Sequence, residues 1–210
     1  MHIDDIMGLG PVIPVIVLDD VDRAVPLARA LAAGGVKVLE VTLRTPAALD
    51  AIRAICENVE GVVVGAGTLL NVRDLDLAMA AGAAFGVSPG TTHSLLTEVQ
   101  DCELPFLPGV ANASNVMDAL EAGFDRMKFF PAEQAGGTPM LRALAGPFPA
   151  VRFCPTGGIG PANAREYLAQ PNVRCVGGSW IAPEALIRER DWTRITELAR
   201  SACALRDGQR

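Results

Sequence analysis

The stretch VKVLEVTL, residues 36–43, is a short apolar run rich in β-branched side chains. An amphipathic stretch, PAALDAIRAICEN at residues 46–58, follows it, and a second apolar run, VVVGAGTL, occupies residues 62–69. Continuous β-branched runs separated by one helical pattern are typical of parallel strands covered by helices. The three segments therefore predict a strand, a helix and a second strand parallel to the first.

The same alternation runs along the whole chain. The other predicted strands lie in PVIPVIVL (11–18), AAFGVSPG (83–90), PFLPGVAN (105–112), RMKFFPA (126–132), VRFCPTGG (151–158) and VRCVGGSW (173–180). Helical patterns fill the gaps, among them residues 22–35, 72–82 and 113–123. Their ends carry Gly34, Gly82 and Gly123, where a helix C-cap is expected.

Eight such units at a spacing of about 25 residues favour a closed (β/α)8 TIM barrel over an open doubly wound sheet. We expect one domain over residues 1–210, with a short helix before Pro11 and a terminal helix from Asp191 onward. Half of the residues are hydrophobic and a fifth are charged, which is enough apolar side chain for a large core. In such barrels the active site lies at the C-terminal ends of the strands.

The net charge is −6, and the sequence has no run of Lys or Arg that could neutralise a row of phosphates, so nucleic acid is not an expected partner. An anionic metabolite remains possible where the site is locally positive. The first apolar run contains two prolines and is too short for a signal core or a membrane span. We therefore expect a cytoplasmic protein that does not interact with membranes.

The cysteines are odd in number and form no close pairs: Cys56, Cys102, Cys154, Cys175 and Cys203. They predict buried free thiols in a reducing compartment rather than a disulfide framework.

The second strand ends in a polar group. With a side-chain period of two, Glu40, Thr42 and Arg44 share one face, and Leu39 and Val41 belong to the opposite face. Packing of the apolar set against helices directs Glu40 and Arg44 toward the barrel mouth. They are either an ion pair with each other or an acid–base group beside an anion-binding guanidinium.

The sixth strand carries Lys128, one of only two lysines in the chain. Its neighbours Met127, Phe129 and Phe130 predict a desolvated amine, and burial disfavours the charged ammonium form. A neutral amine can attack a ketone and form an iminium. The alternative is a lysine that snorkels to the surface. Lys37 stands at the start of its strand, far from the mouth. The second and sixth strands of a barrel face each other, so Lys128 and Glu40 can converge.

Other strand ends suit a ligand. Thr68 follows the third strand, and its hydroxyl could bind a substrate or act only as a cap; Gly65 and Gly67 suit close approach. Pro89 and Pro108 would shape loops around the mouth. Gly157 and Gly158, and then Gly177, Gly178 and Ser179, follow the last two strands, where barrels commonly hold a phosphate on backbone N–H groups.

The two histidines, His2 and His93, are too few for the usual ligand set of a zinc-dependent aldolase, and no dinucleotide or P-loop fingerprint is present. We expect chemistry that needs neither a metal nor a redox cofactor.

These motifs resemble a known family. VLEVTLRTP, GAGTLLN, PGVANASNVMDALEAGFDRMKFFPAE, RFCPTGGI and CVGGSW are similar to the 2-keto-3-deoxy-6-phosphogluconate (KDPG) / 4-hydroxy-2-oxoglutarate (KHG) aldolases, over nearly the whole chain. The resemblance implies Lys128 as the Schiff-base lysine and Glu40 as the general acid–base residue. It implies further substrate contacts from Arg44, Thr68, Pro89, Phe130 and Thr156, and a phosphate site at Gly157, Gly158, Gly178 and Ser179. It also implies a cytoplasmic homotrimer.

The implied reaction is class I aldol cleavage of a phosphorylated 2-keto-3-deoxy acid to pyruvate and glyceraldehyde 3-phosphate. Cleavage of 4-hydroxy-2-oxoglutarate to pyruvate and glyoxylate, and decarboxylation of oxaloacetate, are plausible side reactions of the same imine. The alternatives are a 2-dehydro-3-deoxy-6-phosphogalactonate aldolase, a sugar-phosphate isomerase or epimerase barrel, and a sugar-phosphate binding module without catalysis.

Overall fold

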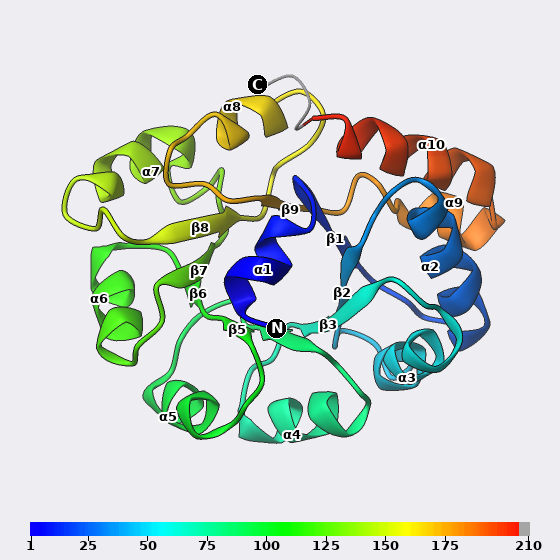
Figure 1. The fold of residues 1–210 in the computed structure, drawn as a ribbon, viewed down its shortest axis with the longest axis horizontal. Helices are drawn as coiled ribbons and strands as arrows, with labels where there is room; N and C mark the ends of the chain where they lie inside the picture. Colours follow the sequence, from blue (N-terminus) through cyan, green and yellow to red (C-terminus); the bar gives the residue numbers. More distant parts are fainter. Residues whose placement is uncertain (206–210) are drawn as a thin grey trace.

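The computed structural model describes residues 1–205, in which parallel strands lie inside an outer layer of helices (Figure 1). Six strands form one parallel, strongly curled sheet in the order β5-β4-β3-β2-β1-β9, and β6-β7-β8 form a second parallel sheet. The strands are β1 (Val12–Ile16), β2 (Val38–Thr42), β3 (Val63–Gly67), β4 (Phe85–Val87), β5 (Phe106–Leu107), β6 (Gly109–Val110), β7 (Arg126–Phe129), β8 (Arg152–Pro155) and β9 (Val176–Gly178).

Helices connect the strands, except between β5 and β6. They are α1 (Ile3–Gly8), a 3-10 turn η1 (Val21–Arg23), α2 (Ala24–Ala33), α3 (Ala48–Asn58), α4 (Val72–Ala80), α5 (His93–Asp101), α6 (Ala113–Glu121), α7 (Gly137–Ala145), α8 (Ala164–Leu168), α9 (Glu184–Glu189) and α10 (Trp192–Cys203). The short helix before Pro11 and the terminal helix after Asp191 are thus confirmed. Residues 206–210 of the predicted domain lie outside the described residues.

Each predicted strand segment contains a strand, with one correction. Residues 105–112 hold two short strands, β5 and β6, on either side of Pro108. A proline has no N–H to give to a ladder, so the pairing breaks there. The Pro108 carbonyl still accepts a hydrogen bond from the Lys128 amide at 2.9 Å, which places β7 beside this segment.

The helix ends follow the predicted glycines at two of three sites. Gly82 and Gly123 have φ values of +89° and +82°, the left-handed conformation expected after a helix. At the end of α2 the left-handed residue is Gly35, with φ +97°, and Gly34 is still right-handed. Gly34 is needed for packing instead, because a Cβ there would lie 2.4 Å from the Cβ of Ala199 in α10.

The core has two parts. The larger cluster lies between the strands and the outer helices and includes Leu39 and Val41, as predicted from their parity. The smaller cluster joins side chains at the strand starts, such as Val38 and Phe85, to Ile6 and Met7 of α1. Figure 1 shows α1 lying across the strands in the middle of the ring of helices. The N-terminal ends of the strands are therefore covered, and the opposite ends are left for a site.

The cysteines form no disulfide within residues 1–205. Cys154 is buried as predicted, but Cys56 is exposed, so the expectation of buried thiols is wrong for that residue. Cys56 lies on the outer side of α3, where its thiol donates to the Gly82 carbonyl at 3.3 Å. Over the same residues, the helices are all too short or too polar to cross a membrane.

Candidate active site

Lys128 and Glu40 meet at the centre of the site. Lys128 is the third residue of β7 and Glu40 is the third residue of β2. The Lys128 Nζ donates to the Glu40 Oε1 at 3.4 Å, and both side chains are about 5% exposed. The predicted convergence of the two residues is confirmed, and the surface-snorkelling alternative for Lys128 is wrong. An amine and a carboxylate are thus in contact away from bulk water.

The surroundings of Lys128 differ from the expectation in one respect. Met127 and Phe129 belong to the outer cluster against the helices, because side chains alternate along β7. Of the predicted apolar neighbours only Phe130 faces the amine, with its ring centroid 5.2 Å from Nζ. The burial of Lys128 therefore comes from residues on the inner face of the sheet, Phe130 among them, and not from Met127 and Phe129.

Two glycines of β3 make room for these side chains. A Cβ on Gly67 would lie 1.9 Å from the Glu40 Oε1, so the Glu40 carboxylate passes directly over this residue. A Cβ on Gly65 would lie 2.3 Å from the ring of Phe85. Close approach of side chains is hence the reason for both glycines.

Arg44 does not pair with Glu40, which was one of the two predicted arrangements. Its Nε instead donates to the Thr68 hydroxyl at 3.3 Å, and its guanidinium is exposed at the mouth. Thr68 itself has φ +62°, a conformation that is strained for a β-branched residue. Strained backbone of this kind clusters at functional sites. The Arg44–Thr68 contact leaves other guanidinium N–H groups able to bind an anion.

Pro89 lies in the turn after β4 and is partly buried. A Cβ on Gly109 would lie 2.3 Å from the Pro89 carbonyl carbon, and the Gly109 amide donates to the buried Ser88 hydroxyl at 3.2 Å. This turn therefore rests on the start of β6, directly beside the β7 strand that carries Lys128.

A cavity of about 230 Å³ opens next to Phe130 at the strand ends. It brings together many of the predicted residues and some that the sequence did not single out: Val15, Val17, Arg44, Phe130, Thr156, Gly157, Gly158, Ile159, Gly177, Gly178, Ser179 and Glu184. Lys128 and Glu40 are not among its lining residues, but the Lys128 Nζ lies 5.2 Å from the centroid of the Phe130 ring, which does line it. Val15, Val17, Ile159 and Glu184 were missed. The only available signal for Glu184 was an acidic residue in the first turn after the GGSW motif.

The predicted phosphate residues form one wall of this cavity. Gly157 and Gly158 have φ values of +103° and +76°, which other residues rarely adopt. Thr156 is buried, and a Cβ on Gly177 would lie 2.2 Å from its hydroxyl oxygen. The Gly178 Cα is covered by the Trp180 ring in the same way. Flexible side chains are thus excluded from the wall, and the backbone is presented to the cavity.

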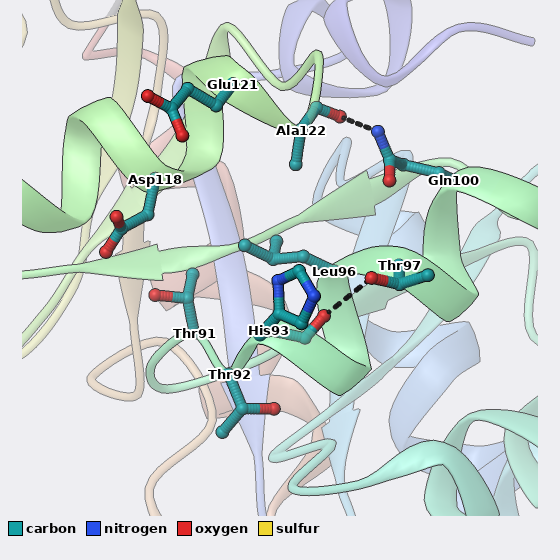
Figure 2. Close-up of a pocket in the computed structure, with 9 residues that line it drawn as sticks. All are labelled: Thr91, Thr92, His93, Leu96, Thr97, Gln100, Asp118, Glu121 and Ala122. Atoms are coloured by element: carbon teal, nitrogen blue, oxygen red, sulfur yellow. Dashed lines mark hydrogen bonds between the residues drawn. The ribbon is translucent and has the colours of Figure 1, made fainter.

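A second hollow, of about 400 Å³, lies outside the strands between α5 and α6 (Figure 2). It is lined by Thr91, Thr92, His93, Leu96, Thr97, Gln100, Asp118, Glu121 and Ala122. The Thr97 hydroxyl donates to the His93 carbonyl, and the Gln100 amide donates to the Ala122 carbonyl, both at 3.0 Å. The lining holds no lysine that could form an imine. Lys128 and Glu40 thus lie in a different part of the molecule, at the strand ends.

The chain is similar to known aldolases over nearly its whole length. Residues 3–198 match the family model described as KDPG and KHG aldolase. The KHG/KDPG aldolase of Escherichia coli (strain K12) is 52% identical over 199 residues, which cover 95% of this chain and 93% of that protein.

Solved structures show the same likeness. The KDPG aldolase from Legionella pneumophila, with pyruvate captured at low pH as a covalent carbinolamine intermediate, is 48% identical with a TM-score of 0.95; the match covers 97% of this chain and 98% of that one. The 2-keto-3-deoxy-6-phosphogluconate aldolase of Zymomonas mobilis ZM4, with 3-phosphoglycerate, is 53% identical with a TM-score of 0.93; the match covers 97% of this chain and 95% of that one.

Proposed function

The chain belongs to the KDPG and KHG aldolase family, and on that premise we propose that Lys128 is the lysine on which it cleaves its substrate. The protein is a class I aldolase, a carbon–carbon lyase. Its main reaction converts 2-keto-3-deoxy-6-phosphogluconate to pyruvate and glyceraldehyde 3-phosphate. The observation that carries the assignment of Lys128 is its buried contact with Glu40 at 3.4 Å.

The geometry supports the following sequence of steps. The Lys128 amine attacks the C2 carbonyl of the keto acid, and loss of water from the carbinolamine gives an iminium. Glu40, acting through a water, takes the proton of the C4 hydroxyl as the C3–C4 bond breaks. The bonding pair moves into the iminium and leaves an enamine of pyruvate, while the aldehyde departs. Protonation at C3 and hydrolysis then return the free amine.

The remaining residues hold the two ends of the substrate. Arg44 binds the pyruvyl carboxylate by a charge-assisted contact, with Thr68 fixing its guanidinium. Pro89, Phe130 and Thr156 line the middle of the site. The phosphate lies on the backbone of the cavity wall, formed by Gly157, Gly158, Gly178 and Ser179.

A second reaction follows from the shared pyruvyl half. Cleavage of 4-hydroxy-2-oxoglutarate to pyruvate and glyoxylate needs the same Lys128, Glu40 and Arg44, and makes no use of the phosphate wall. The name KHG/KDPG aldolase of the Escherichia coli relative supports this assignment.

We also propose that the strands close into a complete (β/α)8 barrel in a single domain. Two features support closure. β5 and β6 are separated only by Pro108, and a parallel bridge joins Thr156, just after β8, to Gly177 of β9. The family resemblance further supports a cytoplasmic homotrimer. Exposed apolar side chains such as Leu70 and Met117 are of the kind that an interface between subunits covers.

Borohydride reduction in the presence of pyruvate tests the central step. Reduction turns the pyruvyl imine into a stable secondary amine, which peptide mass spectrometry locates. We expect the adduct on Lys128 and not on Lys37, which is exposed ahead of β2. A folded protein that gives no adduct in excess pyruvate would remove the imine from the mechanism and favour the isomerase alternative.

A further inference from the structure

The segment after β7 and the loop after β8 are joined behind the cavity wall. The Ala132 amide donates to the Thr156 carbonyl at 2.8 Å, and the Glu133 amide donates to the Gly157 carbonyl at 3.1 Å. These bonds carry the β7–β8 pairing beyond the strands themselves. The chain that bears Lys128 is thereby held in register with the glycines that face the cavity.

The Glu133 side chain lies directly against one of those glycines. A Cβ on Gly158 would be 2.5 Å from the Glu133 Cγ and 2.8 Å from its Cβ. The aliphatic stem of Glu133 therefore packs directly against the Gly158 backbone. Its carboxylate is a negative charge close to the wall where the phosphate of the substrate is proposed to bind.

Tyr167 of α8 determines where that carboxylate points. The Tyr167 side chain is fully buried, and its hydroxyl donates to the Glu133 Oε1. Burial, and then the hydrogen bond to Glu133, raise the pKa of Tyr167 well above its ordinary value, so the hydroxyl stays a donor. A buried donor of this kind holds the carboxylate on the α8 side.

We propose that the Tyr167–Glu133 pair positions the phosphate end of the substrate, a role that rests on the function proposed above. The pair fixes the Gly157–Gly158 loop relative to Lys128, and it keeps the Glu133 carboxylate turned away from the phosphate oxygens. Tyr167 and Glu133 are positioning residues, because neither is proposed to touch the reacting atoms. Without the hydroxyl, the carboxylate is free to rotate toward the cavity and repel a phosphate dianion.

Tyr167→Phe tests this role, since it keeps the ring and removes the hydroxyl. We expect the KM for 2-keto-3-deoxy-6-phosphogluconate to rise about tenfold, with kcat changed less than about twofold. The rate of borohydride trapping with pyruvate, which has no phosphate, should stay within about twofold of wild type. An unchanged KM, or an equal loss in the KM and trapping assays, would overturn the proposal.

Two further variants separate positioning from general support. Thr196→Val is the matched control: it removes the hydrogen bond from the Thr196 hydroxyl to the Ala30 carbonyl at 2.9 Å, between α10 and α2, which does not involve Tyr167 or Glu133. It should leave the KM within about twofold. Adding Glu133→Gln to Tyr167→Phe removes the displaced charge and should restore most of the KM. A double variant whose KM is as high as that of Tyr167→Phe would overturn the proposed charge repulsion. Absence of trapping in the wild type would instead contradict the proposed function.

Discussion

Charged side chains pair at both ends of the strands, but the two pairs differ in burial and in contact. At the start of β7, the Arg126 Nε donates to the Asp4 Oδ1 at 2.6 Å, and these side chains are 21% and 43% exposed. Further along the same strand, Lys128 contacts Glu40 at 3.4 Å, and both side chains are nearly inaccessible. The shorter contact, between Arg126 and Asp4, is thus the one more exposed to solvent.

The two pairs also differ in how many partners they have. Arg126 contacts Asp125 at 3.0 Å in addition to Asp4, and Arg174 approaches Asp4 at 3.8 Å. Such a network ties α1 to the strands and contributes little free energy per pair, because water and salt screen it. A buried pair with few contacts is costly to desolvate and adds little stability. The proposed function gives the Lys128–Glu40 pair a chemical role instead, so variants of the two ion pairs should have different effects.

The largest effect should come from the two lysines. Lys128→Ala removes the proposed imine, and we expect turnover to fall by about 10⁴-fold or more. The far-ultraviolet circular dichroism spectrum should be unchanged. Lys37→Ala is the matched control, because Lys37 is the other lysine and is exposed just before the start of β2. Turnover by Lys128→Ala within tenfold of wild type would place the nucleophile elsewhere.

Replacing the carboxylates of Glu40 and Asp4 should change kcat by amounts that differ nearly as much. Glu40→Gln keeps the shape of the side chain and removes its proton affinity, so kcat should fall about 10²- to 10⁴-fold. Pyruvate should still be trapped on Lys128, more slowly. Asp4→Asn makes the same change at the N-terminal ends of the strands and should leave kcat unaltered. Steady-state kinetics of both variants decide the matter, and a normal kcat for Glu40→Gln would exclude it as the acid–base group.

A smaller effect is expected from the arginines. Arg44→Lys keeps the charge but loses the planar fork that binds a carboxylate through two N–H groups. We expect the KM to rise about tenfold for phosphorylated and unphosphorylated substrates alike, because both share the pyruvyl carboxylate. Arg174→Ala, beside Asp4 of α1, should change neither KM. A change confined to the phosphorylated substrate would instead place Arg44 at the phosphate.

Much of this comparison could be predicted from the sequence. The period-two pattern of residues 36–43 places Glu40 on the inner face, and the order of the strands brings it toward Lys128. Both inferences depend on regular geometry, which is the same in every parallel strand. The catalytic roles of the two residues stay predictions.

Other features depend on tertiary contacts that no local pattern contains. Tyr167 and Glu133 are 34 positions apart, and their hydrogen bond exists only because α8 packs against the segment after β7. The φ of +62° at Thr68 is unusual for threonine and is imposed by its surroundings. Burial of Lys128 was predicted partly for the wrong reason, since Met127 and Phe129 lie on the opposite face of the strand and only Phe130 faces the amine.

The smallest expected effect is the acid sensitivity of the ion pair between Asp4 and Arg126, at the N-terminal ends of the strands. The hydrogen bond from Arg126 holds the pKa of Asp4 below its ordinary value of 3.8, although partial burial opposes this. A carboxyl whose pKa is lower in the folded state stabilises that state above its unfolded pKa. The contribution is lost as the pH falls below 3.8 through the folded pKa.

Because the Asp4 side chain is 43% exposed and solvent screens its charge, its contribution to the free energy of unfolding should be under about 1 kcal/mol. Urea titrations of wild type and Asp4→Asn should differ by this amount at neutral pH and converge as the pH falls below 3.8 through the lowered pKa of Asp4. About 0.5 M salt should narrow the difference at neutral pH. A stability difference that persists in acid would mean that the carboxamide disturbs the packing of α1. The charge of Asp4 would then not be what holds α1 against the strands.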